Sequence, residues 1–145
     1  MASTPEVVKK LVGKGFDVVV ERGAGVAAHY PDDDYTSAGA KISDRTAVLQ
    51  ADILLKVRRP EAQGAAAMKP GAIYIGFVET CGEDEIVGAM VARDVRVLSV
   101  ERIPRISRAQ SMDVLSSQSN IAGYRAVIEA ANEFGSFFTG QVTAA

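Results

Sequence analysis

The residue types best suited to ligand chemistry are concentrated in the stretch 101–120, whose composition differs from its surroundings. Its three arginines, within seven residues of one another, are Arg102, Arg105 and Arg108. A guanidinium group can make paired hydrogen bonds to a phosphate or a carboxylate. The short polar side chains that follow are Gln110, Asp113, Ser116 and Ser117. These groups suit ribose hydroxyls or a carboxamide, so the stretch favours a binding loop.

A purely structural role accounts for part of the same stretch. Serine, aspartate and asparagine commonly cap helix N-termini, and we expect Ser117 or Ser119 to cap a helix over 120–134. Surface arginines often pair with a carboxylate to little energetic effect. From the residues alone, a ligand-binding loop and an ordinary capped helix start both remain open.

The elements that would position this stretch alternate between helix and strand. Helices are predicted over 5–11, 31–38, 44–50, 65–68, 83–92 and 120–134, and strands over 16–21, 52–57, 72–77 and 95–100. This alternation predicts an α/β fold with a doubly wound, mostly parallel sheet, of flavodoxin-like or Rossmann-like type, in one domain over 1–145. Ligands of such sheets bind beyond the carboxyl ends of the strands, where 101–120 begins. The chain opens on a helix and stops after its longest one, so we expect an incomplete domain, with a small domain that starts on a helix as the alternative.

Composition limits the class of function. Net charge is −2 with both signs scattered along the chain, which gives no bias toward nucleic acid. Cys81 and His29 are the only cysteine and histidine, so neither an intramolecular disulfide nor a His/Cys metal site is expected. No apolar run approaches the ~20 residues that span a bilayer. We therefore predict no metal site, no nucleic-acid partner and no membrane span.

A glycine pattern at 23–28 resembles a dinucleotide fingerprint. Gly23-Ala-Gly-Val-Ala-Ala28 follows a predicted strand and matches G-x-G-x-x-A. A functional fingerprint opens directly into a helix whose amides hold the pyrophosphate, whereas His29-Tyr30-Pro31 interrupts any such helix here. The expected acidic residue would fall near Asp44, before the next strand begins. We therefore expect a plain turn.

A longer run carries a more specific resemblance. Residues 104–127, PRISRAQSMDVLSSQSNIAGYRAV, with shorter runs at 4–11, 21–26 and 55–60, closely resemble the first domain of the proton-translocating NAD(P) transhydrogenase alpha subunit. They resemble alanine dehydrogenase more loosely. The similarity extends over nearly all 145 residues.

The resemblance implies a role for the loop that starts at Arg105. In that family the loop reaches over the nicotinamide end of NAD(H), which a second, Rossmann domain mainly binds. The cofactor-binding positions implied are Arg105, Ile106, Ser107, Gln110, Asp113 and Ser116. Arg105 would lie near the pyrophosphate or carboxamide, Gln110 toward the NADP(H) side, and Asp113 with Ser116 at the carboxamide and ribose. Direct hydride transfer needs no protein acid or base, so we expect no catalytic residue.

The resemblance also implies partners and a location. They are an NADP(H)-binding component, membrane components and a second copy in a homodimer. The complex would lie on the cytoplasmic face of a bacterial inner membrane, or on the matrix side in a mitochondrion.

Departures from the family limit these expectations. The sequence shows neither the family's opening strand and acidic loop before Ala2 nor its Rossmann domain after Ala145, and 62–67 is shorter than usual. We therefore expect the isolated chain to bind NAD weakly or not at all, and to be inactive alone. A non-catalytic docking or dimerisation module, and a remnant without a stable fold, remain as alternatives.

An alanine dehydrogenase-like interpretation depends on two positions. That family places a substrate-binding lysine where Lys56 lies, but the match is one of position, and we favour a strand-terminal lysine that reaches toward water. The family's acid/base histidine would fall at Gly76-Phe77-Val78, and without it the reduction of pyruvate lacks its proton carrier. Alanine dehydrogenase activity is therefore disfavoured.

Overall fold

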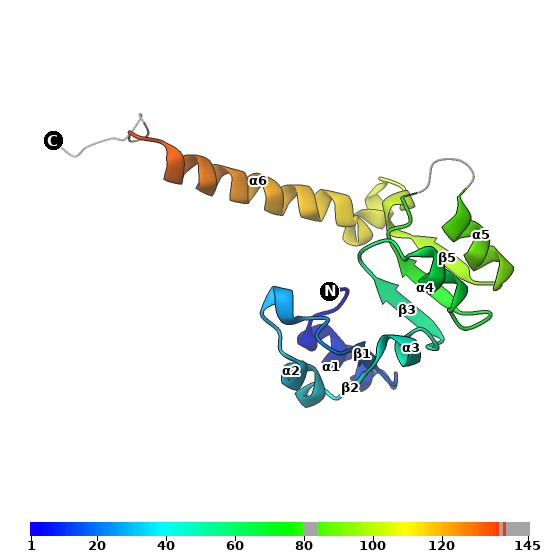
Figure 1. The fold of residues 1–145 in the computed structure, drawn as a ribbon. Helices are drawn as coiled ribbons and strands as arrows, with labels where there is room; N and C mark the ends of the chain where they lie inside the picture. The colour runs from blue at the N-terminus through cyan, green and yellow to red at the C-terminus, as the bar shows by residue number, and fades with distance from the viewer. Residues whose placement is uncertain (80–83, 137, 139–145) are drawn as a thin grey trace. The chain divides into compact units, whose positions relative to one another are not determined.

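The computed structural model describes residues 1–79, 84–136 and 138, and divides into two compact units (Figure 1). The first is Met1–Ile103 and the second Pro104–Ala145. Cys81 and the predicted helix start at Glu83 lie outside the described residues. The prediction of one domain over 1–145 stays a prediction.

The first unit alternates helices and strands as the sequence predicts, with one strand, β2, added. Its elements are α1 (Pro5–Gly13), β1 (Val19–Glu21), η1 (Val26–Ala28), α2 (Asp32–Ser37), β2 (Lys41–Ser43), α3 (Arg45–Val48), β3 (Ile53–Lys56), α4 (Ala62–Ala66), β4 (Ile73–Gly76), α5 (Glu85–Ala92), β5 (Arg96–Ser99) and η2 (Val100–Arg102). The second unit contains the 3-10 helix η3 (Ser107–Met112) and the helix α6 (Val114–Glu133). Strand β2 was not among the predicted strands.

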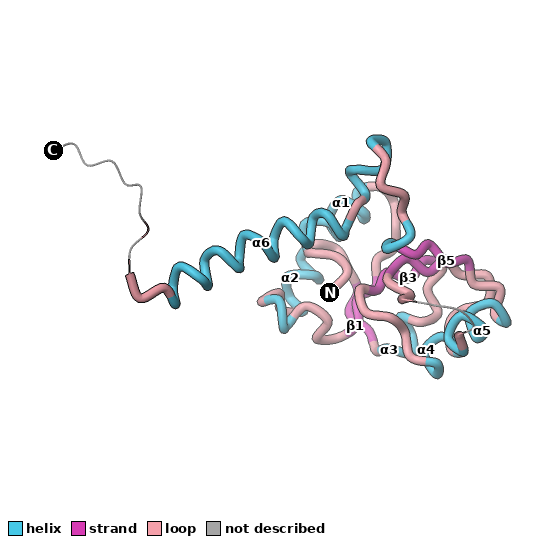
Figure 2. The backbone as a smooth tube through the Cα atoms, turned by 90° about the horizontal axis from the view of Figure 1, so that it is seen from above, coloured by secondary structure: helices cyan, strands magenta, loops and turns pink. Residues whose placement is uncertain are grey.

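The strands, magenta in Figure 2, form two parallel sheets, which confirms the predicted α/β class. β1 pairs with β2 in register Val20↔Ile42. In the second sheet the order is β3-β4-β5, with Leu54 opposite Tyr74 and Tyr74 opposite Val97. The carboxyl ends of β3, β4 and β5 therefore lie at one edge, and the stretch that carries the three arginines follows β5 in the chain.

Two apolar clusters form the core of the first unit. The larger cluster packs α4 and α5 against one face of β3-β4-β5, and its buried members are Leu54, Ala65, Met68, Tyr74, Val78, Met90 and Val95. The smaller cluster joins α1, α2 and the β1–β2 sheet through Val8, Tyr35 and Ala40.

The opposite face of the three-stranded sheet is open within the described part of 1–103. Ile53 and Leu55 are each 41% exposed and Leu98 is 57% exposed. α4 and α5 pack on the side of the even-numbered residues of β3, so its odd-numbered residues face away from this core.

Candidate functional site

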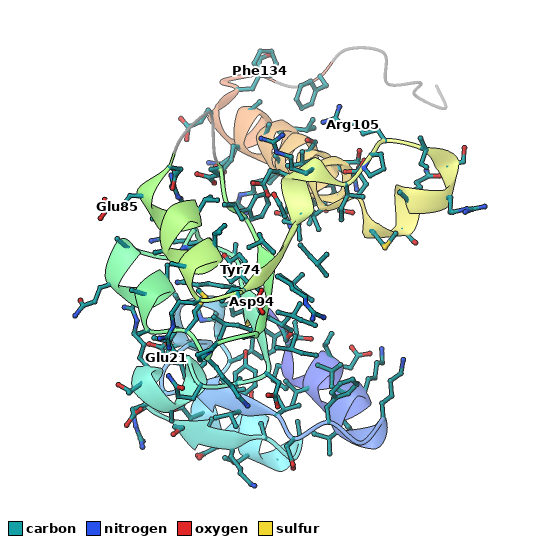
Figure 3. The ribbon with its side chains drawn as sticks, turned by 90° about the vertical axis from the view of Figure 1, so that its right-hand side faces the viewer. Glu21, Tyr74, Glu85, Asp94, Arg105 and Phe134 are labelled. Carbon is teal, nitrogen blue, oxygen red and sulfur yellow. The ribbon has the colours of Figure 1, made fainter. Side chains whose placement is uncertain are left out.

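The predicted binding loop has a defined backbone in the second unit. Ala109 donates its N–H to the carbonyl of Ile106 at 2.9 Å, and Asp113 donates to Gln110 at 3.3 Å. Only Ala109 of η3 is buried, so the side chains around it point outward. Arg105 and Gln110 are exposed, and Ile106 is 56% exposed (Figure 3). The loop therefore presents a cation, an amide and an apolar side chain from a short, internally hydrogen-bonded turn.

Asp113 caps α6, which begins earlier than the sequence predicts. Oδ1 of Asp113 accepts the N–H of Ser116 at 3.0 Å, and Oδ2 accepts its hydroxyl at 2.6 Å. The hydroxyl of Ser117 donates to the Asp113 carbonyl at 3.1 Å. The predicted cap at Ser117 or Ser119 is wrong, because α6 begins at Val114 and Asp113 accepts the first-turn N–H of Ser116.

The charge state of Asp113 follows from this arrangement. Hydrogen bonds from the Ser116 hydroxyl and then the Ser116 N–H lower the pKa of Asp113, and the positive charge of Arg105 lowers that pKa further. Three of the six predicted cofactor positions thus interact. Ser116 donates hydrogen bonds to Asp113, and the positive charge of Arg105 acts on the Asp113 carboxylate. Ile106, Ser107 and Gln110 lie on the same turn with exposed side chains.

Glu101 is a site-forming residue that the sequence interpretation passed over. Its Oε1 accepts the N–H of Val78 at 2.9 Å and of Glu79 at 2.7 Å. Burial raises the pKa of Glu101, but the N–H groups of Glu79, Glu101 and Val78 outweigh burial and bring that pKa down to about 2. The ionised carboxylate therefore fastens the segment after β4 to the segment after β5, shortly before the loop begins in the chain.

A second carboxylate holds the same edge of the sheet. Asp84 forms an ion pair with Arg59 and caps α5 by accepting the N–H of Ile86 at 2.9 Å. The hydrogen bond from Arg59 lowers the pKa of Asp84. The segment after β3 is thereby tied to the start of α5. Tyr74, inside the core (Figure 3), donates its hydroxyl to the Phe77 carbonyl at 3.0 Å.

The two positions relevant to alanine dehydrogenase lie side by side. A Cβ added at Gly76 would come within 2.0 Å of the Lys56 carbonyl oxygen, so this point of β4 accepts glycine alone. Lys56 lines a cavity of about 70 Å³ together with Glu21 of β1 and Arg45 of α3. The neighbouring strand β4 ends in glycine at this point, so it offers Lys56 no acid/base side chain of the kind that a histidine would supply.

The glycine pattern at 23–28 is a turn, as predicted. Gly23 has a φ of +74° and donates its N–H to the Asp32 carboxylate at 2.9 Å. A Cβ at Gly25 would meet the Tyr30 carbonyl at 2.5 Å. The 3-10 helix that follows ends at once in His29, whose φ is +61°. The Gly23 amide is therefore taken by the chain's own Asp32, and Gly25 is packed against Tyr30.

Comparison with known proteins places this architecture in a family. The model for "Alanine dehydrogenase/PNT, N-terminal domain" matches residues 1–122. The chain belongs to this family. The resemblance expected from the 104–127 run is confirmed.

Three similar proteins indicate which branch of this family the chain resembles. The chain is 48% identical to NAD(P) transhydrogenase subunit alpha of Haemophilus influenzae over 145 residues, covering 100% of the chain and 28% of the relative. It is 45% identical to NAD(P) transhydrogenase subunit alpha of Cereibacter sphaeroides over 147 residues, covering 100% and 28%. The crystal structure of transhydrogenase from Sinorhizobium meliloti matches with a TM-score of 0.87 and 46% identity, covering 99% of the chain and 43% of that protein. The chain thus spans less than half the length of each of these relatives.

Two classes of feature are missing from the described residues. No helix there is long and apolar enough to cross a membrane. No three His, Cys, Asp or Glu side chains of that part of the chain are grouped so that they could hold a metal ion.

Proposed function

We propose that this chain is the N-terminal, NAD(H)-side domain of a proton-translocating transhydrogenase, which transfers a hydride between NAD(H) and NADP(H). The supporting observation is the loop 104–113, which presents exposed Arg105 and Gln110 from a hydrogen-bonded turn. Its sequence lies in the run that carries the family resemblance. Identities of 48% and 45% to two transhydrogenase alpha subunits support this branch over alanine dehydrogenase.

The residues of the loop fit one end of a dinucleotide. Arg105 is a permanent cation with several N–H donors, which suits a pyrophosphate oxygen or a carboxamide carbonyl. Gln110 can donate and accept toward the NADP(H) side, while Ile106 and Ser107 line the approach. Asp113 and Ser116 already bond each other, so a ribose or carboxamide would share those groups with the helix cap.

The remaining part of the nucleotide needs a second domain. The Gly23–Gly25 turn is filled by Asp32 and Tyr30, and the described residues offer no other glycine turn that opens into a helix. When bound, NAD(H) supplies or accepts the hydride. The contribution of this chain is to orient the nicotinamide and to exclude water around it. Because a hydride transfer moves no separate proton, none of the six loop residues is assigned acid or base chemistry.

The proposal extends to the assembly. It places an NADP(H)-binding component opposite the loop, a second copy of the chain in a homodimer, and membrane components beyond them. It places the complex at the cytoplasmic face of a bacterial inner membrane, or on the matrix side of a mitochondrion. The isolated chain is inactive and binds NAD weakly in this proposal.

Complementation tests the proposal directly. The 145-residue chain is mixed with the separately expressed Rossmann domain and NADP(H)-binding component of the Cereibacter sphaeroides transhydrogenase, and hydride transfer from NADPH to an NAD⁺ analogue of distinct absorbance is followed. We expect transfer only in the full mixture. Arg105→Ala should reduce the rate at least about tenfold, whereas Arg22→Ala, which removes an exposed arginine outside the loop, should not. Low-micromolar binding of NAD to the chain alone, measured by titration calorimetry, would contradict it.

A docking module is the second candidate. It is favoured by α6, whose 20 residues include none that are buried, and by the exposed Ile106 and Met112 of the loop. In the complementation experiment this candidate predicts assembly of the components without dependence of the transfer rate on Arg105.

A further inference from the structure

Three consecutive backbone groups directly after β4 are held by two side chains. The buried Tyr74 (Figure 3) donates its hydroxyl to the Phe77 carbonyl at 3.0 Å. Oε1 of Glu101 accepts the next two N–H groups, from Val78 at 2.9 Å and from Glu79 at 2.7 Å. This turn is therefore fixed to the core on one side and to Glu101 on the other.

The backbone of Glu79 indicates that the hold on this turn is firm. Its φ is +52°, in the left-handed region that residues with a side chain rarely adopt. Such a conformation persists only where the surrounding contacts impose it. The short bond from the Glu79 N–H to the Glu101 carboxylate is one such contact.

Only three residues separate Glu101 from Arg105, and their backbone has little freedom. Pro104 fixes its own φ and keeps the preceding residue extended, and Ile103 accordingly lies at φ −62° and ψ 124°. After Pro104, Ile106 donates its N–H to the Pro104 carbonyl at 2.9 Å, which closes a tight turn around Arg105. A hold on Glu101 therefore reaches Arg105 through a short, stiff piece of chain.

We propose that Glu101 is a positioning residue for hydride transfer, which holds the start of the loop 104–113 and so determines where the Arg105 guanidinium stands. The assignment rests on the function proposed above, since it gives Glu101 a part in that reaction. Oε1 of Glu101 is already occupied by two backbone N–H groups. Glu101 therefore acts through Arg105 rather than on the cofactor itself.

A different role would be that of a fastener that only joins β4 to β5. Such a fastener would stabilise the fold, but its loss would leave the contribution of Arg105 unchanged. The loss of a positioning residue must change what Arg105 contributes. Spatial continuity alone does not establish such a connection, whereas a double-mutant cycle measures it.

Kinetics in the complementation mixture described above test the assignment. Glu101→Gln keeps the size of the side chain and one oxygen but removes the charge. We expect it to lower the maximal rate of hydride transfer about tenfold, while KM for the NAD⁺ analogue changes less than about twofold. KM should change little because the Rossmann domain binds most of the nucleotide in this proposal. Glu61→Gln neutralises an exposed carboxylate and should change neither quantity.

Combination with Arg105→Ala tests whether Glu101 acts through Arg105. Arg105→Ala alone is expected to reduce the rate at least about tenfold. In that background Glu101→Gln should reduce the rate further by less than about twofold, because no guanidinium remains to be positioned. Independent effects would instead multiply to about a hundredfold.

Amide exchange on the full 145-residue chain tests the hold without any cofactor. In Glu101→Gln, exchange at Val78 and Glu79 should become about tenfold faster, because their acceptor has lost its charge. Exchange at Ile106 should become about fivefold faster, since the start of the loop is no longer held. Val8→Ala provides the control, because it destabilises the other core cluster and should leave exchange at Ile106 unchanged.

A second variant applies the same tests from the other end of this path. Each variant is first checked for a cooperative thermal melt. If Glu101→Gln fails that check, Tyr74→Phe frees the Phe77 carbonyl and so loosens the turn that Glu101 holds. It should give a smaller loss of maximal rate, and again none in the Arg105→Ala background.

Three results would overturn the proposal. Faster exchange at Val78 and Glu79 with no change at Ile106 would make Glu101 a fastener of the two strands alone. Losses that multiply in the double variant would mean that Glu101 acts independently of Arg105. A raised KM with an unchanged maximal rate would indicate binding rather than positioning. Absence of transfer with the wild-type chain would count against the proposed function, and exchange at Ile106 would still decide whether Glu101 holds the loop.

Discussion

Replacing Glu101 with glutamine isolates the contribution of the charge that ties β4 to β5. The carboxylate accepts the N–H groups of Val78 and Glu79 at 2.9 and 2.7 Å, and the pKa of Glu101 is about 2 against an ordinary value of 4.5. By linkage, such a difference corresponds to ~3 kcal/mol of folding free energy at neutral pH. Glu101 is only partly buried, so solvent screening reduces this to ~2 kcal/mol. We expect Glu101→Gln to lose about that much stability at pH 7 in urea unfolding.

The pH dependence of the stability difference between wild type and Glu101→Gln is the sharper test. Because the pKa of Glu101 is lower in the folded protein than in the unfolded chain, its contribution is complete above the ordinary value of 4.5 and is lost as pH falls toward 2. Roughly half of the difference between wild type and Glu101→Gln should therefore be gone by about pH 3. A difference that stays constant between neutral pH and about pH 3 would refute the assignment of the effect to the charge.

A surface carboxylate provides the control for this experiment. Glu61 pairs with Arg45 at 3.2 Å but its side chain is 75% exposed. Glu61→Gln should change the free energy of unfolding by less than ~0.5 kcal/mol. If both variants lost equal stability, general charge balance rather than the contacts of Glu101 would explain the result.

Three further predictions concern Gly76, Tyr74 and Asp113. Gly76→Ala should cost about 3 kcal/mol in urea unfolding, because its Cβ would meet a backbone carbonyl at 2.0 Å. The control is Gly88→Ala on α5, where an added Cβ meets nothing within 4 Å, and this variant should be neutral or stabilised by up to ~1 kcal/mol. Burial, and then the charge of a nearby carboxylate, raise the pKa of Tyr74 to about 12. The stabilisation that depends on the protonated Tyr74 hydroxyl is therefore present below the ordinary value of 10 and lost as pH rises through 12, and tyrosinate absorbance should follow this titration. Tyr74→Phe should cost ~1 kcal/mol of unfolding free energy, because a carbonyl then lacks its donor. The first turn of α6 should fray as pH falls below 3.8, since the pKa of Asp113 is lowered by Ser116, and faster exchange of the Ser116 amide would report it.

The strands show how much of the fold a local sequence pattern predicts. β3 and β4 are apolar runs bounded by turns, which indicates strands, and their alternation with helices indicates a parallel sheet. β2 is only Lys41-Ile42-Ser43 between a glycine turn and a helix cap, too short and too polar to produce a pattern. It forms because β1 offers it a ladder, as in the bond from Lys41 to the Val18 carbonyl. Such pairing lies outside what a window of sequence contains.

The start of α6 illustrates a competition between equivalent signals. Asp113, Ser116, Ser117 and Ser119 are all good caps, and local preference does not rank them. The structure selects Asp113, which accepts both the N–H and the hydroxyl of Ser116. That choice also changes the meaning of the predicted site, since the two residues expected to bind ribose or carboxamide are first of all partners of each other.

The anchoring of the loop required knowledge of strand order. Glu101 and Val78 are 23 positions apart, and they meet because β4 and β5 are parallel neighbours whose carboxyl ends share an edge. A carboxylate with a pKa of about 2 stays ionised throughout the physiological range, so this fastening does not weaken with ordinary changes of pH. The exposed turn that bears Arg105 begins shortly after Glu101 in the chain. Whatever movement the loop makes to receive a ligand therefore starts from a fixed point, as the positioning role proposed for it requires.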